Sequence, residues 1–290
     1  MAAGLPLYPQ VACRPIVFEY DLRFPVAFDT WAFFKPVREA RSEQEKMALY
    51  RDPAYRQAFR DELAGNGGND SHFAGGRQEG ETRRRSFTLT ELSWYPPDPG
   101  LEGRRLVDIA AGRGVPVADL MFDLAVDAGL ETRFRTPVSN FDEDEVEEIL
   151  QDPNVIVGLG DGGAHASQLC DACYSTHLLG HWVRERQALT LERAVHMLSG
   201  RPADIYGIAD RGRLAPGHAA DIVVFDPATV GAGPLERRKD FPGGAARFIS
   251  RPAGIHAVVV NGTVLPPPDH PFPEGMPLPG KLLRGGKARD

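Results

Sequence analysis

The sequence has few cysteines, no long apolar run and no excess of basic residues. Only three of its 290 residues are cysteine, and three thiols cannot make the disulfide framework of a small secreted domain. No apolar run approaches the roughly 20 residues of a membrane helix. The N-terminus also lacks the charged start and apolar core of a signal peptide. These absences predict a cytoplasmic protein with no membrane partner.

The charge balance argues against a nucleic-acid partner. The formal net charge is -7, with 33 Lys and Arg against 40 Asp and Glu, whereas nucleic-acid-binding domains are usually basic. The arginine run at residues 83–85 is interpreted as a solvated loop. What the chain does contain, 42% hydrophobic and 25% charged residues, is ordinary for a globular protein with a sizeable core.

The segment at residues 155–165 joins a short apolar run to a glycine-rich loop around Asp161. The run is typical of a strand buried on both faces, as in a parallel sheet covered by helices. Ligands gather at the C-terminal ends of such strands, so Asp161 is a candidate catalytic or metal-binding residue. His165 would lie over the same edge and is a candidate substrate contact. Capping of the next helix is the alternative role for Asp161.

Arg14, a pair of cysteines and a pair of histidines can each have either a functional or a simple structural role. Arg14 follows a predicted strand and could bind a substrate carboxylate through two parallel hydrogen bonds, although Arg before Pro is equally typical of a structural contact. Cys170 and Cys173 form a C-x-x-C pair, but a zinc site would need two more ligands, and packing at a helix start is favoured. His177 and His181 share one helix face, where a packed or solvated pair is favoured over a metal site.

Hydrophobic periodicity divides the chain into alternating helices and strands. Helical spacing covers residues 31–63, 117–128, 143–150, 175–186 and 191–198, with Asn140 and Thr190 as expected caps. Strand patterns cover residues 16–20, 87–94, 155–159, 222–225, 255–260 and 263–265. The last two are expected to form a hairpin about Asn261 and Gly262. The alternation predicts an α/β fold, followed by a C-terminal β module and a proline-rich tail.

Several of these segments resemble parts of one known superfamily. Residues 210–226 resemble the return segment by which amidohydrolase chains leave their metal-binding barrel for a small β-sandwich, and the hairpin about Asn261 is similar to the matching sandwich hairpin. Residues 160–165 resemble the end of the eighth barrel strand in the N-acyl-D-amino-acid deacylase branch. Residues 10–15 are similar to the seventh-strand region of that branch.

The resemblance implies the C-terminal part of a metal-dependent (β/α) barrel hydrolase. One or two zinc ions would polarise the amide carbonyl of a small N-acyl amino acid. Asp161 would bind metal or its water and pass a proton to the leaving amine, releasing a carboxylate and a D-amino acid. The implied organisation is a late barrel strand region (1–30), an inserted helical lid (31–150), the last strand–helix unit (151–206) and a β-sandwich module with a tail (207–290).

The sequence departs from the superfamily in its metal ligands. Amidohydrolases use a His-x-His pair on strand one, then a bridging carboxylate, thiolate or carboxylated lysine and later histidines, and the eight histidines here include no His-x-His. A complete barrel takes roughly 250 residues. The isolated chain is therefore expected neither to bind zinc tightly nor to hydrolyse N-acyl-D-amino acids, and to self-associate or pair with a separate N-terminal half. The alternatives are a cyclic-amide hydrolase of the same superfamily and a non-catalytic remnant or binding module.

Overall fold

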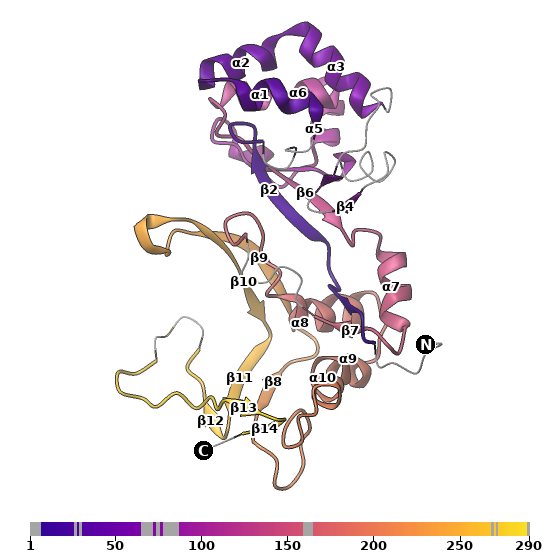
Figure 1. Ribbon diagram of the computed structural model, residues 1–290, viewed down its shortest axis with the longest axis vertical. Coiled ribbons are helices and arrows are strands. Elements are labelled where there is room, and N and C mark those ends of the chain that lie inside the picture. The colour runs from indigo at the N-terminus through magenta and orange to yellow at the C-terminus, as the bar shows by residue number, and fades with distance from the viewer. Residues whose placement is uncertain are drawn as a thin grey trace. The chain divides into compact units, whose positions relative to one another are not determined.

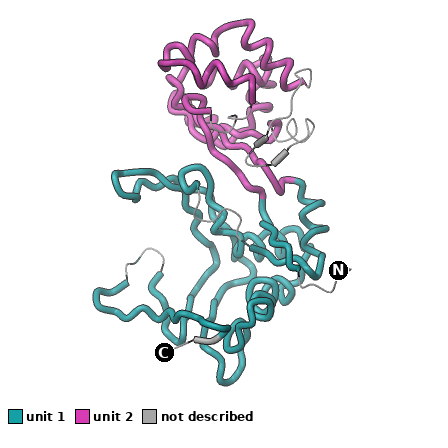
Figure 2. Tube along the Cα trace, viewed as in Figure 1, with its two compact units in different colours: residues 1–14, 142–290 teal, residues 15–141 magenta. Residues whose placement is uncertain are grey.

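The computed structural model describes residues 7–25, 28, 31–64, 72–73, 76–77, 87–158, 165–267, 270 and 272–288. The chain divides into two compact units, which Figure 2 shows in teal and magenta. Unit 1 consists of residues 1–14 and 142–290, and unit 2 of residues 15–141. Each unit contains both helices and strands, so the predicted mixed α/β character is confirmed. No helix among the described residues has the length and apolar character needed to cross a membrane.

Unit 2 is built on a three-stranded antiparallel sheet of order β2-β6-β5 (Figure 1). Its strands are β2 (Ile16–Asp21), β6 (Arg133–Ser139) and β5 (Glu91–Trp94). Tyr20, Phe134 and Leu92 lie opposite one another across the sheet and are buried on one face. Strand β6 was not predicted from the sequence, because Pro137 interrupts its strand pattern.

Helices pack on the buried face of this sheet. They are η2 (Ala32–Phe34), α1 (Lys35–Glu39), α2 (Glu43–Arg51), α3 (Pro53–Leu63), η3 (Pro99–Leu101), α5 (Leu106–Arg113) and α6 (Val117–Asp127). A short hairpin of β3 (His72–Phe73) and β4 (Gly76–Arg77) follows α3. The fully buried aromatic rings of the helices include Phe34, Tyr50, Phe59 and Phe122. This aromatic cluster shows why residues 31–63 carry a helical apolar pattern.

The first half of unit 1 combines one short parallel strand pair with a group of helices. The strands are β1 (Gln10–Val11) and β7 (Ile156–Val157). The helices are α7 (Glu143–Gln151), α8 (Tyr174–His177), the π-helix η4 (Leu178–Glu185), α9 (Leu191–Leu198) and α10 (Gly200–Ile205). The predicted helix at residues 175–186 is thus an α-turn that continues as a π-helix.

The helix caps were predicted with mixed success. Thr190 caps α9, because its side chain accepts a hydrogen bond from Arg193 N at 3.2 Å. Asn140 does not cap α7, so that prediction was wrong. Asp142 takes the role instead, accepting hydrogen bonds from the main-chain nitrogens of the first turn, while Asn140 has a φ of 55°.

The rest of unit 1 is mostly antiparallel β structure. One sheet has the order β12-β11-β8, with β8 (Ile222–Phe225), β11 (Ile255–Val260) and β12 (Thr263–Val264). The turn residues Asn261 and Gly262 have φ values of 45° and 81°, as a two-residue hairpin requires. The hairpin prediction is confirmed.

A second hairpin was not predicted. It joins β9 (Gly231–Arg238) to β10 (Arg247–Ala253), with η5 (Pro242–Gly244) at the turn. Its glycines, prolines and arginines hide any apolar alternation. Near the C-terminus, β13 (Leu283–Arg284) pairs with β14 (Lys287–Ala288). The proline-rich tail is held where Asn261 Nδ2 donates to Pro279 O at 2.7 Å.

Candidate functional site at the ends of β1 and β7

Two parallel strands bring the candidate segments to one edge. β1 and β7 run side by side in parallel (Figure 1), so their C-terminal ends lie at the same edge. Gly158 N extends the pairing by donating to Val11 O at 3.0 Å. Arg14 follows β1, and the segment with Asp161 follows β7. The predicted buried strand therefore exists, and a second strand that ends near Arg14 pairs with it.

Gly158, directly after β7, lies in close contact with the Gln10 side chain. A Cβ at this position would lie 2.1 Å from Gln10 Nε2, so the Gln10 amide rests against the Gly158 backbone. Glycine is the residue that permits such a close approach. The close neighbour of Gly158 is thus a side chain of the adjacent strand.

Of the two candidate residues in the loop after β7, the structure describes only His165. Asp161 lies outside the described residues, so its catalytic and metal-binding roles stay predictions. His165 is exposed, and its φ of 51° falls in the left-handed region, which few residues other than glycine adopt. Its carbonyl oxygen accepts hydrogen bonds from Gln168 N at 2.7 Å and Leu169 N at 3.0 Å. Its predicted contact with substrate also stays a prediction.

Arg14 is held by the turn that precedes α8. Its Nη1 donates to Cys170 O at 2.7 Å and to Cys173 Sγ at 2.9 Å, and lies 3.7 Å from Asp171 Oδ1. The Asp171 side chain is 3% exposed, and a carboxylate so buried needs a compensating charge. Arg14 therefore ties this turn to the end of β1. The structure gives Arg14 internal partners, and its role toward substrate remains a prediction.

All three cysteines lie in this part of unit 1. Each is a free thiol, with Cys13 and Cys173 buried and Cys170 half-buried. Cys13 Sγ donates to Tyr174 O at 3.3 Å, and burial raises the pKa of Cys13 to about 12. The C-x-x-C pattern drew attention to the cysteines, yet the buried residue with a charged partner is Asp171 between them. Only its burial identifies it, and no local pattern reveals that.

The two helical histidines are packed against each other, as the sequence analysis favoured. The rings of His177 and His181 stack with centroids 4.9 Å apart and an interplanar angle of 21°. Burial, and then electrostatic interaction with the neighbouring His181, lower the pKa of His177 to about 4. His177 is therefore neutral near pH 7.

Trp182 fixes the main chain at the end of β1, which the sequence analysis missed. Its indole N–H donates to Cys13 O, and the ring is 1% exposed. The hydrogen bond spans 169 positions in the sequence, so no local pattern could reveal it.

Metal-binding side chains do not gather in the described part of the chain. No three His, Cys, Asp or Glu side chains among these residues gather so that they could hold a metal ion. His177 and His181 are the alternative metal pair. Among the described residues, carboxylates lie within ion-pair distance of His181 but not of His177. The described residues therefore do not form a zinc site by themselves.

Comparison with known proteins gives one consistent relationship. The model of the amidohydrolase family matches residues 77–266. The chain is 37% identical over 203 residues to N-acyl-D-glutamate deacylase of Alcaligenes xylosoxydans xylosoxydans, and 34% identical over 178 residues to D-aminoacylase of the same organism. These matches cover 67% and 60% of this chain but 36% and 33% of those proteins. The chain thus spans roughly a third of the length of these relatives.

One solved structure is similar in sequence over much of the chain. It is N-acyl-D-glutamate deacylase from Bordetella bronchiseptica, in complex with zinc and a phosphonate inhibitor that mimics the tetrahedral intermediate of the reaction. The sequence identity is 34%, and the match covers 64% of this chain and 37% of that one. The TM-score is 0.38.

Proposed function

Because this chain belongs to the amidohydrolase family, we propose that it supplies the C-terminal part of a zinc-dependent N-acyl-D-amino-acid deacylase. The reaction is hydrolysis of a linear amide bond, which yields a carboxylate and a D-amino acid. The observation that carries this proposal is the 37% identity to N-acyl-D-glutamate deacylase over 203 residues. A cyclic-amide hydrolase is the second candidate, supported by shorter matches such as one of 65 residues with a dihydroorotase of Lactobacillus johnsonii.

In this proposal β1 and β7 are the last two strands of the barrel. Their parallel pairing supports this assignment, as does the helix that follows the loop after β7. Residues 31–150 are assigned to the inserted lid. Residues 31–141 of it belong to unit 2, whereas residues 142–150 belong to unit 1. Residues 1–30 and 151–206 are assigned to the barrel, and 207–290 to the β-sandwich module with its tail.

The chemical role assigned to this chain is proton transfer. Asp161 follows a strand end, where a carboxylate can face the reacting amide. It is proposed to take a proton from the attacking water and to deliver it to the leaving nitrogen. Zinc is the cofactor that the family relationship implies, and no three described side chains gather to hold it.

The substrate contacts assigned to this chain are Arg14 and His165. Arg14 Nε is buried and has no hydrogen-bond partner among the described residues, so the guanidinium group retains an N–H without an acceptor. His165 lies on an exposed turn four positions after Asp161. We assign the substrate carboxylate to Arg14 and a polar substrate contact to His165.

Complementation tests this function. The part of the Alcaligenes N-acyl-D-glutamate deacylase that precedes its matched region would be produced together with this chain, and amino-acid release from N-acetyl-D-glutamate measured. N-acetyl-L-glutamate is the stereochemical control, and dihydroorotate tests for cyclic-amide hydrolysis. Release of D-glutamate only when both chains are present supports the proposal. A purified, zinc-containing complex that releases no D-amino acid contradicts it.

A further inference from the structure

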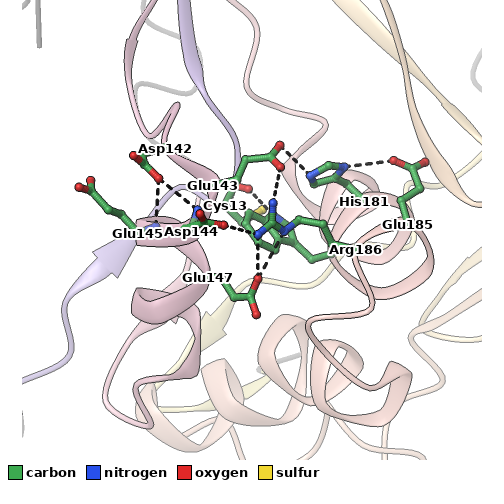
Figure 3. A network of polar contacts seen from close by, with 10 residues as sticks. Cys13, Asp142, Glu143, Asp144, Glu145, Glu147, His181, Glu185 and Arg186 are labelled. Atoms are coloured by element: carbon green, nitrogen blue, oxygen red, sulfur yellow. Dashed lines mark hydrogen bonds and ion pairs between the residues drawn. The ribbon is translucent and has the colours of Figure 1, made fainter. Parts of the chain in front are cut away.

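A cluster of charged side chains joins α7 to the π-helix η4 within unit 1 (Figure 3). Arg186 contacts three acids of α7, namely Glu143 at 2.9 Å, Asp144 at 2.7 Å and Glu147 at 3.1 Å. Arg184 lies 3.0 Å from Glu185. Four carboxylates therefore face two guanidinium groups, and one more positive charge would be favourable in this cluster.

His181 occupies the place where that charge can arise. Its Nδ1 lies 3.1 Å from Glu185 Oε2, within hydrogen-bond reach. Its Nε2 lies 2.9 Å from Glu143 Oε1, in ion-pair contact rather than in hydrogen-bond alignment. A neutral imidazole has one N–H, so one nitrogen would point a lone pair at a carboxylate, whereas an imidazolium presents an N–H to each.

We propose that His181 is an imidazolium held between Glu143 and Glu185, and that this ring is a proton-dependent clamp joining α7 to η4. Its contribution to stability is present while the ring is protonated and is lost as the pH is raised and the proton leaves. The clamp rests on contacts within unit 1 alone, so it does not depend on the proposed deacylase function.

The other groups around His181 are consistent with a single protonated ring. His177 stacks on it and stays neutral near pH 7, because burial and the charge on His181 lower its pKa, with a smaller effect from Arg14. Of the two stacked rings, His181 is therefore the one that takes up the first proton. Helix α9 and strand β9 also pack against η4. Within the described part of the chain, neither places a carboxylate within ion-pair distance of the His181 ring.

The clamp is coupled to the candidate site through Trp182. The His181 and Trp182 rings are nearly perpendicular, with centroids 5.3 Å apart, and the Arg186 guanidinium lies over the same indole, 5.5 Å from its centroid. The indole N–H in turn holds Cys13 O, one residue before Arg14. Loss of the His181 proton is thus expected to weaken the fixation of Trp182 and of the end of β1. His181 is a positioning residue in this scheme.

The test uses the full chain labelled with nitrogen-15. NMR would follow the ring nitrogens of His181 and the solvent exchange of the Trp182 indole N–H between about pH 5 and 8, where histidines ordinarily titrate. We expect both ring nitrogens to be protonated at the acid end. Indole exchange should rise several-fold as that proton is lost, beyond the rise that free indole shows over the same range. A His181 with one protonated nitrogen throughout, or corrected exchange that ignores pH, overturns the proposal.

Two variants and one control make the test specific. His181→Gln cannot be protonated, so its corrected indole exchange should be fast and independent of pH. Glu185→Gln alters only an exposed carboxylate and should reduce the pH response even if His181→Gln fails to fold. His196→Gln, an exposed histidine on α9, should leave the response unchanged. A full pH response in folded His181→Gln or in Glu185→Gln would refute the clamp.

Discussion

Replacing Arg14 with methionine would break the contact between β1 and the turn before α8. The substitution keeps most of the aliphatic stem and removes the guanidinium. It leaves the Asp171 carboxylate, whose side chain is 3% exposed, without the Arg14 charge. It also removes the donor to Cys170 O and Cys173 Sγ. Unit 1 should therefore become less stable.

The expected loss follows from the geometry of the pair. Breaking a well-formed buried ion pair costs about 3–5 kcal/mol. The Arg14 and Asp171 atoms are 3.7 Å apart and Arg14 is 14% exposed, so the lower part of that range applies to the charge. The main-chain hydrogen bond adds about 1 kcal/mol. We expect the opening free energy of this region to fall by about 3–4 kcal/mol.

Hydrogen exchange read by mass spectrometry suits this prediction, because it reports residues 165–182 separately from unit 2. The matched control is Asp171→Asn, which removes the charge and keeps the shape. The double variant Arg14→Met with Asp171→Asn should recover about 1–2 kcal/mol relative to the sum of the single losses. Purely additive losses, or an Arg14→Met protein that exchanges like the wild type, would refute the assigned pairing.

Three further predictions concern the same region. Gly158→Ala places a methyl group against the Gln10 amide, the end of an exposed side chain that can move aside, and should cost unit 1 about 1 kcal/mol or less; a larger loss in thermal melting that Gln10→Ala does not reverse would contradict this. Trp182→Phe removes the donor to Cys13 O and should cost about 1–3 kcal/mol, less than the about 3–5 kcal/mol expected for Trp182→Ala; equal losses would argue against the hydrogen bond. Because burial raises the pKa of Cys13 to about 12, iodoacetamide at about pH 8 should modify Cys170 well before Cys13, and peptide mass spectrometry showing the reverse order would contradict the burial.

Local signals explain most of what the sequence predicted about the fold. Asn261 and Gly262 supply the positive φ values of the hairpin turn, and Thr190 caps α9 with its own side chain. Both effects act within three residues. Asn140 and Asp142 compete for one helix start, and only the three-dimensional path of the chain decides for Asp142.

Elements that depend on distant partners escaped prediction. Strand β6 contains Pro137 and is stabilised by pairing with β2 and β5 on its two sides. The β9–β10 hairpin has no apolar alternation, and each strand is recognisable only through the other. A sequence pattern records the preferences of neighbouring residues and contains little about such pairings.

The same distinction applies to the candidate site. The strand end before Arg14 was predictable, but the partner Cys173 is 159 positions away. The importance of Asp171 and of the Trp182 indole arises from burial and from contacts across unit 1. The segment with Asp161 was found from its strand-and-glycine pattern, and its contacts lie outside the described residues.

The most direct test of the deacylase assignment is the turnover rate of the complemented enzyme with and without the Asp161 carboxylate. General acid–base catalysis by one side chain contributes roughly 10²- to 10⁴-fold to a rate. D-glutamate release from N-acetyl-D-glutamate should therefore fall by about that factor in Asp161→Asn, in a complex that assembles as the wild type does. An Asp161→Asn complex that turns over at the wild-type rate would contradict the role of this chain in catalysis.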